Sequence, residues 1–308
     1  MKKINYILTG ALLLFSSALF SQQESIFTSY RYHMNMVNPA YAGIDNETIL
    51  VSSIRKQWVG IKDAPETQAV SFGTNMKKNL GMGASLVSDK TFIETQVFFG
   101  IDFSYKVKLT ATTDMYLGLK VGGNVYDVNT SGLETYLPNG ANDPSLRSIN
   151  NFNPNIGAGM VIKRGKFFYS LSVPRMLNTV RAKNQDGIAT VATDRPHFYM
   201  SSGYDFDLNA SKTLILKPSF MMRYVSGAPL SADINALLNM YKYVEIGATY
   251  RTDNAQTTGG YFPMNTYAAI FNLYISKKFS VGYMYEMNTR KQLASALNTN
   301  EFLLRFKF

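Results

Sequence analysis

Histidine is the side chain that most readily performs acid–base chemistry near neutral pH. The chain has only two histidines, His33 and His197, and Asp194, Ser201 and Ser202 lie close to the second one. A Ser-His-Asp triad requires a spatial arrangement that closeness along the chain does not supply. A proline precedes His197 at the start of an alternating segment, so we expect a half-exposed ring at a membrane interface. We predict no catalytic residue.

Metal and cofactor sites are not expected either. Cysteine is absent, and the histidines and carboxylates show no ligand spacing. Gly81-Met82-Gly83 and Gly157-Ala158-Gly159 lie inside alternating segments, without the strand-to-helix setting of a phosphate loop. Small residues of this kind make room at a barrel wall. The basic residues form no run of five or six, so nucleic-acid binding is not expected. The sequence thus predicts a protein that is not an enzyme and holds no cofactor.

The N-terminus has the pattern of a secretory signal peptide. Met1-Lys2-Lys3 is basic, the stretch from Ile7 to Phe20 is apolar, and the chain turns polar at Ser21. A membrane-spanning helix needs about twenty apolar residues, so a retained anchor is the less favoured alternative. We predict a signal peptide over residues 1–21 and an exported mature chain from Gln22.

The composition favours a barrel whose outer surface meets lipid. Charged residues make up 17% of the chain, and there are 20 Tyr and 20 Phe. A water-soluble domain usually has about 25% charged residues. Because the mature sequence has no long apolar run, short alternating strands are the expected membrane-spanning elements.

An alternation of period two runs through the chain, and the segment 96–109 shows it best. Successive strand side chains point to opposite faces, and about nine to eleven tilted residues cross a bilayer. One face of this segment is apolar: Val97, Phe99, Ile101, Phe103, Tyr105, Val107 and Leu109. The other is mostly polar or small: Gln96, Phe98, Gly100, Asp102, Ser104, Lys106 and Lys108. The segments 115–125, 167–173, 243–251 and 279–288 repeat the pattern.

Fourteen such strands are predicted, with twelve or sixteen as alternatives. They are expected at 48–57, 67–77, 80–89, 94–109, 113–127, 154–163, 166–174, 196–207, 212–226, 229–239, 241–251, 266–276, 278–288 and 299–308. The links alternate between short turns and longer segments, among them 130–153, 175–195 and 252–265. This predicts an all-β, antiparallel up-and-down transmembrane barrel. An even strand number places both termini on the short-turn side, the periplasm.

The second face of the strands carries charges as well as Gly and Ser. These charges are Asp102, Lys106, Lys108, Lys120, Glu245, Arg251, Glu286 and Arg305. They could pair across the lumen, but simple solvation in a water-filled channel is the favoured expectation.

The last strand closes the predicted barrel. Phe302, Leu304, Phe306 and Phe308 share one face, and the chain stops on the aromatic residue. We interpret this as a lipid-facing closing strand that ends in the aromatic girdle. A terminal Phe with alternate apolar residues also resembles the recognition signal of outer-membrane barrel assembly. In water, an exposed apolar edge of this kind would promote aggregation.

Two N-terminal motifs carry a resemblance to a known family. The first is Asn38-Pro39-Ala40-Tyr41-Ala42-Gly43, and the second is Arg55-Lys56-Gln57-Trp58-Val59-Gly60 followed by Pro65-Glu66-Thr67. Taken singly, these residues have ordinary explanations: Pro39 and Gly43 suit a turn, and Trp58 suits a membrane interface. Together they resemble the PorP/SprF family of outer-membrane proteins of the Bacteroidetes type IX secretion and gliding system.

The resemblance implies an accessory barrel in the outer membrane. Its expected partners are type IX secretion components, outer-membrane lipid and a secreted surface protein, such as an adhesin with a C-terminal sorting domain. The implied organisation is a signal peptide (1–21), a periplasmic N-terminal segment (22–46) that plugs the lumen or contacts partners, and the barrel (47–308). A passive porin or substrate channel is the alternative function.

Overall fold

The computed structural model describes residues 27–76, 79–130, 148–180, 193–226, 228–257, 260–288 and 298–308. The predicted signal peptide and most of the predicted links 130–153 and 175–195 fall outside these ranges. No helix in the described ranges is long and apolar enough to cross a membrane.

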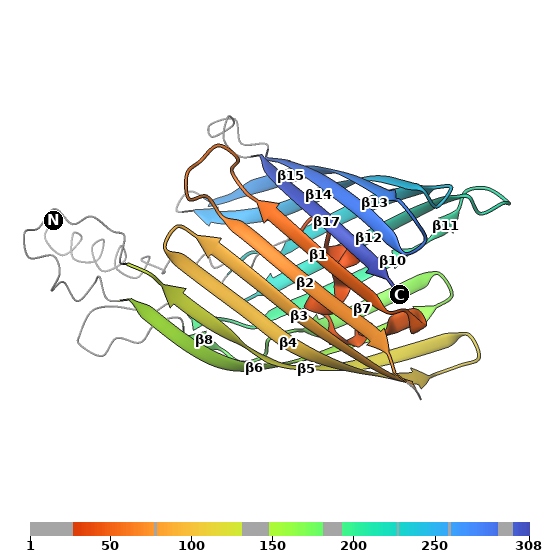
Figure 1. The fold of residues 1–308 in the computed structure, drawn as a ribbon, viewed down its shortest axis with the longest axis horizontal. Helices are drawn as coiled ribbons and strands as arrows, with labels where there is room; N and C mark the ends of the chain where they lie inside the picture. The colour runs from red at the N-terminus through yellow and green to blue at the C-terminus, as the bar shows by residue number, and fades with distance from the viewer. Residues whose placement is uncertain are drawn as a thin grey trace, which may run out of the picture.

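One antiparallel sheet closes on itself to form a barrel (Figure 1). Its strands are β1 (Ile49–Lys56), β2 (Glu66–Asn75), β3 (Leu80–Thr91), β4 (Glu94–Lys108), β5 (Thr113–Val128), β6 (Ile149–Arg164), β7 (Phe167–Val173), β10 (His197–Tyr204), β11 (Phe206–Asp207), β12 (Leu214–Val225), β13 (Ser231–Met240), β14 (Val244–Thr257), β15 (Gly260–Tyr274), β16 (Phe279–Asn288) and β17 (Thr299–Lys307). Because β10 and β11 both pair with β12, they act as one strand, and the described barrel has fourteen. The predicted fold is confirmed.

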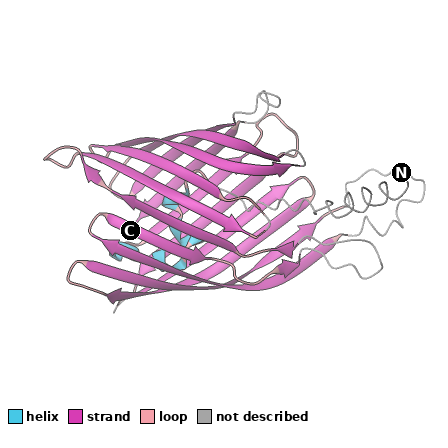
Figure 2. Cartoon of the chain, turned by 180° about the vertical axis from the view of Figure 1, so that it is seen from behind, coloured by secondary structure: helices cyan, strands magenta, loops and turns pink. Residues whose placement is uncertain are grey.

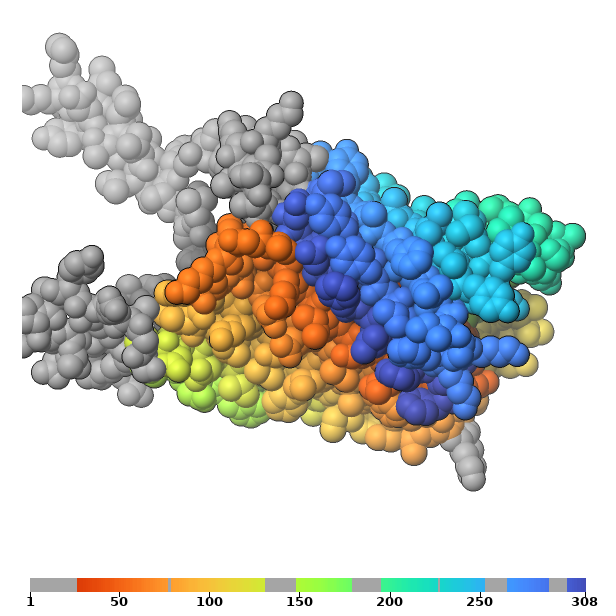
Figure 3. Space-filling view, turned by 45° about the horizontal axis from the view of Figure 1, so that its top comes forward, coloured from red at the N-terminus to blue at the C-terminus, as the bar shows by residue number. Residues whose placement is uncertain are grey.

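The first and last strands close the barrel. β1 pairs with β17 from Ile49↔Lys307 to Lys56↔Asn300, and the two strands lie side by side in Figure 3. The backbone N–H of Phe308 also donates to the carbonyl of Thr48 (3.0 Å). Closure leaves no unpaired edge between these strands, as a membrane barrel requires.

Two predicted links are wrong in extent. The register between β14 and β15 runs on to Thr257↔Gly260, so most of the predicted link 252–265 is strand. β6 begins at Ile149, which shortens the predicted link 130–153. Neighbouring antiparallel strands can continue their ladder beyond the apolar band, and there the alternation that marked the other strands is lost. A further two-residue pair, β8 (Thr179–Val180) with β9 (Thr193–Asp194), was not predicted.

The two faces of the wall match the predicted alternation. On β4 and β5, Ile101 is 49% exposed and Leu119 is 63% exposed, whereas Asp102 and Asn124 are fully buried. The outward side chains are therefore apolar and the inward ones mostly polar, as expected for a barrel in lipid.

Residues 27–46, which precede β1, lie inside the barrel as a series of helical turns (Figures 1 and 2). We call residues 27–46 the N-terminal segment. It contains η1 (Tyr30–Tyr32), α2 (Met34–Val37), η2 (Pro39–Tyr41) and η3 (Ile44–Asn46). The Asn38 side chain caps η2 by accepting from the N–H of Ala40 (2.9 Å), and Pro39 occupies the first position of that turn.

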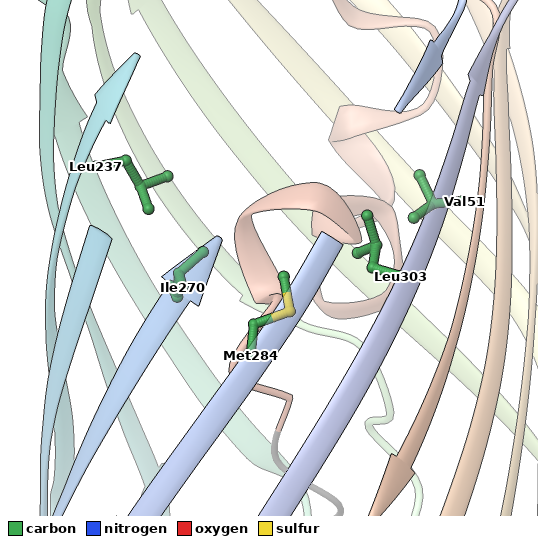
Figure 4. Close-up of a cluster of buried hydrophobic side chains, with 5 residues drawn as sticks. All are labelled: Val51, Leu237, Ile270, Met284 and Leu303. Atoms are coloured by element: carbon green, nitrogen blue, oxygen red, sulfur yellow. The ribbon is translucent and has the colours of Figure 1, made fainter. Parts of the chain in front are cut away.

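Apolar clusters fasten the N-terminal segment to different parts of the wall. One contains Val51, Leu237, Ile270, Met284 and Leu303 (Figure 4). Tyr32 of the segment packs against this cluster. A second contains Tyr30, Tyr199 and Met221, and a third contains Ala40, Tyr116 and Val161. Each cluster joins the segment to strands far away in sequence, so the segment and the barrel form one packed body.

The position of Leu119 on the lipid-facing surface gives a direct test of the fold. Leu119→Arg should lower the free energy of unfolding by about 2–4 kcal/mol, because it puts a charge into the hydrocarbon band. Leu109→Arg, at the short-turn end, should cost at most about 1 kcal/mol. Urea unfolding in lipid vesicles measures both, and equal effects would contradict the assigned membrane position.

Candidate functional site in the barrel lumen

The N-terminal segment runs along the length of the lumen. At one end, the N–H of Thr28 donates to Glu301 (3.0 Å) and its hydroxyl donates to Glu286 (2.7 Å). Glu286 lies near the end of β16 that leads into a long link. Directly after the other end, Glu47 pairs with Lys307 and with Arg305 (3.6 Å), beside the short links. The segment therefore reaches from the long-link half to the short-link end.

Asn38 is bound where β6 and β7 meet. Its Nδ2 donates to the Ser170 hydroxyl (2.8 Å) and to the carbonyls of Met160 (3.1 Å) and Leu171 (3.2 Å). Its side-chain carbonyl accepts from Ala40, so both ends of the amide are used. Asn38 is fully buried, and a buried amide is stable only when its polar atoms are satisfied.

Glycines of the wall make room for the first motif. A Cβ added to Gly118 would lie 2.6 Å from the Cα of Ala40, and one added to Gly159 would lie 2.7 Å from the Cγ of Asn38. A Cβ at Gly81 would lie 2.9 Å from the carbonyl carbon of Ala42. All three distances are far below van der Waals contact. The glycines of these strands therefore make room for the N-terminal segment, and they do not form a phosphate-binding loop.

The rest of the first motif also contacts the wall. The Ser104 hydroxyl donates to the carbonyl of Ala42, and the Tyr41 ring meets Phe168 edge-on at 6.4 Å between centroids. Gly43 has φ +70°, and a Cβ there would lie 2.7 Å from the carbonyl carbon of Thr74. Gly43 is therefore needed both for its left-handed backbone and for its close approach to β2.

Buried ion pairs occupy the lumen wall near the long links. Arg251 contacts Asp233 through Nε (2.9 Å) and Nη2 (3.2 Å), and Arg223 contacts the same carboxylate at 2.9 and 3.0 Å. Arg55 reaches both oxygens of Glu286 at 3.2 and 3.3 Å. For Arg251 and Glu286, the expectation of simple solvation is wrong. They are packed behind the N-terminal segment, where an unpaired charge would be very costly.

Lys120 links the wall to the N-terminal segment. Its ammonium group donates to the carbonyls of Asn35 (3.1 Å) and Met36 (3.3 Å) and to the Ser85 hydroxyl (3.0 Å). It also lies 3.2 Å from the buried Asp102 carboxylate. A cation at the last turn of a short helix donates hydrogen bonds to the carbonyls that have no partner within the helix. Sequence reasoning placed Lys120 inward but missed this role, because its partners come from the N-terminal segment.

The second motif is divided between the lumen and a long link. Arg55 and Thr67 are buried in the lumen, and the Thr67 hydroxyl donates to Asp89 (2.7 Å). Gln57 donates its N–H to the carbonyl of Pro65 (2.9 Å), which closes the β1–β2 link. Trp58 is 40% exposed in that link, and Gly60 has φ +101°. The described contacts do not join the two motifs into one site.

The side chains proposed to close the barrel lie on its outer surface. Phe302 is 57% exposed and Phe308 is 71% exposed. The Phe302 ring packs on Tyr283 (5.0 Å between centroids) and the Phe306 ring on Phe279 (4.7 Å). Leu304 stands opposite Ser52 of β1.

The two histidines have unrelated surroundings. The Nδ1 of His33 lies 2.9 Å from the Ser71 hydroxyl, its Nε2 has no hydrogen-bond partner, and burial lowers its pKa to about 3. His197 is half-exposed, with Nδ1 3.0 Å from the carbonyl of Arg195. No group of three or more His, Asp or Glu side chains in the described ranges could hold a metal ion.

Comparison with known proteins decides the family. The model of the type IX secretion system membrane protein PorP/SprF matches residues 19–306. The chain belongs to the PorP/SprF family. Both N-terminal motifs lie within the matched range, and the family is one of type IX secretion membrane proteins.

Solved structures show the same fold at low identity. The monoaromatic hydrocarbon channel CymD is 9% identical, with a TM-score of 0.54 over 89% of this chain and 91% of that chain. Omp33 from Acinetobacter baumannii is 8% identical, with a TM-score of 0.49 over 85% and 99%. The likeness to CymD supports the barrel fold of this PorP/SprF member. No curated protein sequence matches the chain.

The glycine contacts predict how the N-terminal segment can be dislodged. Gly118→Ala combined with Gly159→Ala should expel η2 from the wall, because both added methyl groups overlap the segment. Hydrogen exchange of residues 38–43 should then accelerate by at least about tenfold, which corresponds to about 1.4 kcal/mol of lost protection. Gly73→Ala is the matched control, since its Cβ would lie 3.4 Å from the nearest segment atom. Equal exchange in all three proteins would contradict the packing.

The burial of His33 predicts that docking of the N-terminal segment in the lumen depends on pH. Its pKa is lower when buried (about 3) than when free (6.5), so protonation favours the undocked segment. The contribution of neutral His33 is complete above pH 6.5 and is lost as the pH falls, by about 2 kcal/mol at pH 5. Hydrogen exchange of residues 30–37 at pH 7 and pH 5, corrected for intrinsic rates, measures the change. His33→Gln should reduce it, and an unchanged pH dependence in that variant would contradict the assignment.

Proposed function

We propose that this PorP/SprF member is a non-enzymatic accessory barrel that helps to secrete or anchor a partner protein at the cell surface. The observation that carries the proposal is the occupied lumen. Asn38, Ala40 and Ala42 are fully buried between the walls, and the segment is held at both ends by charged side chains. A barrel filled in this way is suited to presenting its ends to other proteins rather than to passing solutes.

The proposed orientation puts the short links and the C-terminus in the periplasm. Short periplasmic turns and long outer links are the usual arrangement of bacterial barrels. The N-terminal segment enters β1 at this same end. A cavity of about 480 Å³ separates the segment from part of the wall here, and Arg31, Asp45 and Lys163 help to line it. This mouth is the proposed meeting place with periplasmic secretion components.

Residues 22–46 were expected to contact a partner or plug the lumen, and the burial of the described part limits which of its residues a partner could touch. Most of the described segment is buried, whereas Asp45 and Asn46 are exposed at the mouth. A periplasmic protein that leaves the segment in place would therefore touch the region around these two residues. A partner could contact the first motif itself only if the segment left its position in the lumen.

The outer end is the proposed contact for the secreted partner. The β1–β2 link at this end carries the exposed side chains of Trp58, Val59 and Ile61, and the links 130–153 and 175–195 are the proposed partner-binding segments. The N–H of Val59 donates to the carbonyl of Asn298 (3.2 Å), and that of Phe92 donates to Asp63 (3.2 Å). These bonds join neighbouring links into one surface. The partner we favour is an adhesin with a C-terminal sorting domain.

A crosslinked purification from native outer membranes tests this function. We expect the barrel to recover a large sorting-domain protein together with secretion components. Exchange of links 130–153 and 175–195 with those of a relative should redirect the secreted partner. Exchange of the short link 208–213 is the control and should leave the partner unchanged. Recovery of the barrel alone, under conditions that preserve other complexes, would sink the proposal.

A passive porin is the alternative function. It would require a continuous aqueous path, and the seated N-terminal segment opposes this. Conductance blocked by a defined solute would favour it.

A further inference from the structure

The short-link end of the barrel carries a surplus of basic side chains. Every acidic side chain that the described residues place at this end already has a basic partner. These pairs are Asp45 with Lys163, Glu47 with Arg305 and Lys307, Asp114 with Lys106, Asp205 with Arg31, Asp207 with Lys166, and Glu245 with Lys217. The other cations at this end therefore have no acidic neighbour left to pair with.

Six of these other cations are exposed, and we call them the cation ring. Within the described chain none of the six has an ion pair. They lie at the short links β4–β5, β6–β7, β11–β12, β13–β14 and β15–β16, at the end of the barrel that also carries the C-terminus (Figure 1). The members of the cation ring are Lys108, Arg164, Lys212, Lys242, Lys277 and Lys278. Because these links follow one another around the sheet, the charges are spread over the circumference of the barrel.

The long-link end shows no such surplus among its described residues. Lys56 there pairs with Glu66 (3.2 Å). The exposed cations at this end are Lys56, Lys62, Lys90 and Arg195, and the acidic side chains beside them include Asp63, Glu66, Asp89, Glu94 and Asp127. The unbalanced positive charge of the described chain is therefore concentrated at the short-link end.

Exposed apolar and aromatic side chains adjoin the cation ring. Leu109 follows Lys108 and is 47% exposed, and Lys242 lies between Tyr241 (62% exposed) and Tyr243 (69% exposed). Tyrosine rings and long basic side chains both suit the membrane interface, where the apolar part stays near the acyl chains and the polar tip reaches the headgroups. An acidic protein would need only one charged face, whereas headgroups surround the whole circumference, as the ring does.

The β13–β14 turn holds one of these cations in an unusual backbone. The N–H of Tyr243 donates to the carbonyl of Met240 (3.0 Å), and the two central residues, Tyr241 and Lys242, have φ +53° and +61°. Asn and Gly are the residues that this kind of tight hairpin turn favours. Bulky residues in left-handed backbone are frequent at functional positions. Here they place an ammonium group between two exposed aromatic rings.

We propose that the cation ring binds the phosphate groups of anionic phospholipids in the leaflet that meets the short links. Basic residues beside a membrane are attracted to anionic headgroups. Contacts around the circumference would fix the depth and tilt of the barrel, and with them the position of the short-link mouth. The lipid contact goes beyond the proposed secretion function, and only the naming of the leaflet as periplasmic rests on the proposed orientation.

Electron paramagnetic resonance of spin-labelled lipids tests the proposal on the purified full mature barrel. The protein is placed in phosphatidylcholine vesicles with a trace of spin-labelled phosphatidylglycerol or spin-labelled phosphatidylcholine. The motionally restricted fraction of each label gives its relative association constant. We expect phosphatidylglycerol to associate at least about fivefold more strongly. Salt at about 1 M should remove most of this preference, since the screening length then falls to about 3 Å.

A matched pair of variants separates the cation ring from net charge. Lys242→Gln combined with Lys277→Gln should lower the preference by at least about fivefold, because two headgroup contacts are lost. Lys62→Gln combined with Lys90→Gln removes the same charge at the long-link end and should leave the preference unchanged. An equal decrease in both variants would overturn the proposal, since general attraction would then suffice.

Two further outcomes would contradict the lipid assignment. The first is equal association of both lipids with the unmodified barrel. The second is an unchanged lipid preference in the Lys242→Gln, Lys277→Gln variant together with loss of a periplasmic protein from the crosslinked purification, which would assign the cation ring to an acidic protein face. The lipid measurement uses the barrel alone, so its failure is distinguishable from failure of the proposed secretion function.

Discussion

A chain segment inside a membrane barrel is stable only if the wall satisfies its polar groups and leaves it enough space. Both conditions are met around residues 38–43. Asn38 uses its amide on two strands and on its own turn, and Gly118 and Gly159 supply the room that any larger residue would take. The charged contacts of Thr28 and Glu47 hold the two ends of the segment. The arrangement of the lumen follows from this fit.

The same fit explains the charges of the lumen. An open channel would solvate Arg251, Asp233 and Glu286, whereas the seated segment removes them from bulk water. They must then neutralise one another, and Arg251 does so by a forked contact with Asp233 (2.9 and 3.2 Å) and a longer one with Glu286 (3.5 Å). Such pairs contribute little net stability compared with apolar packing, but a missing partner is expensive. The ion pairs therefore favour one arrangement of the segment and the wall over arrangements that would leave a charge without its partner.

Much of the barrel could be predicted from sequence. Period-two alternation over 96–109 and the apolar face of Phe302 to Phe308 identify strands and their lipid side without any tertiary information. The ends of β14 and β15 could not be found in this way, because outside the apolar band the ladder persists without an apolar face.

The candidate site was less accessible to sequence reasoning than the fold. The residues of the first motif can be recognised in the sequence. Their types do not show where they lie, because an exposed turn and a segment inside the lumen both use Asn, Pro and Gly. The glycines of β3 and β6 stand out in the sequence, but the N-terminal segment that lies against them is far away along the chain. Membership of the PorP/SprF family then places this occupied barrel in type IX secretion.

Single-channel recording in planar bilayers tests the central claim most directly. We expect the full mature barrel to show no stable conductance, and a variant lacking residues 27–42 to show large, persistent conductance steps. Equal conductance in the two proteins would contradict it, because the N-terminal segment would then not be what closes the lumen.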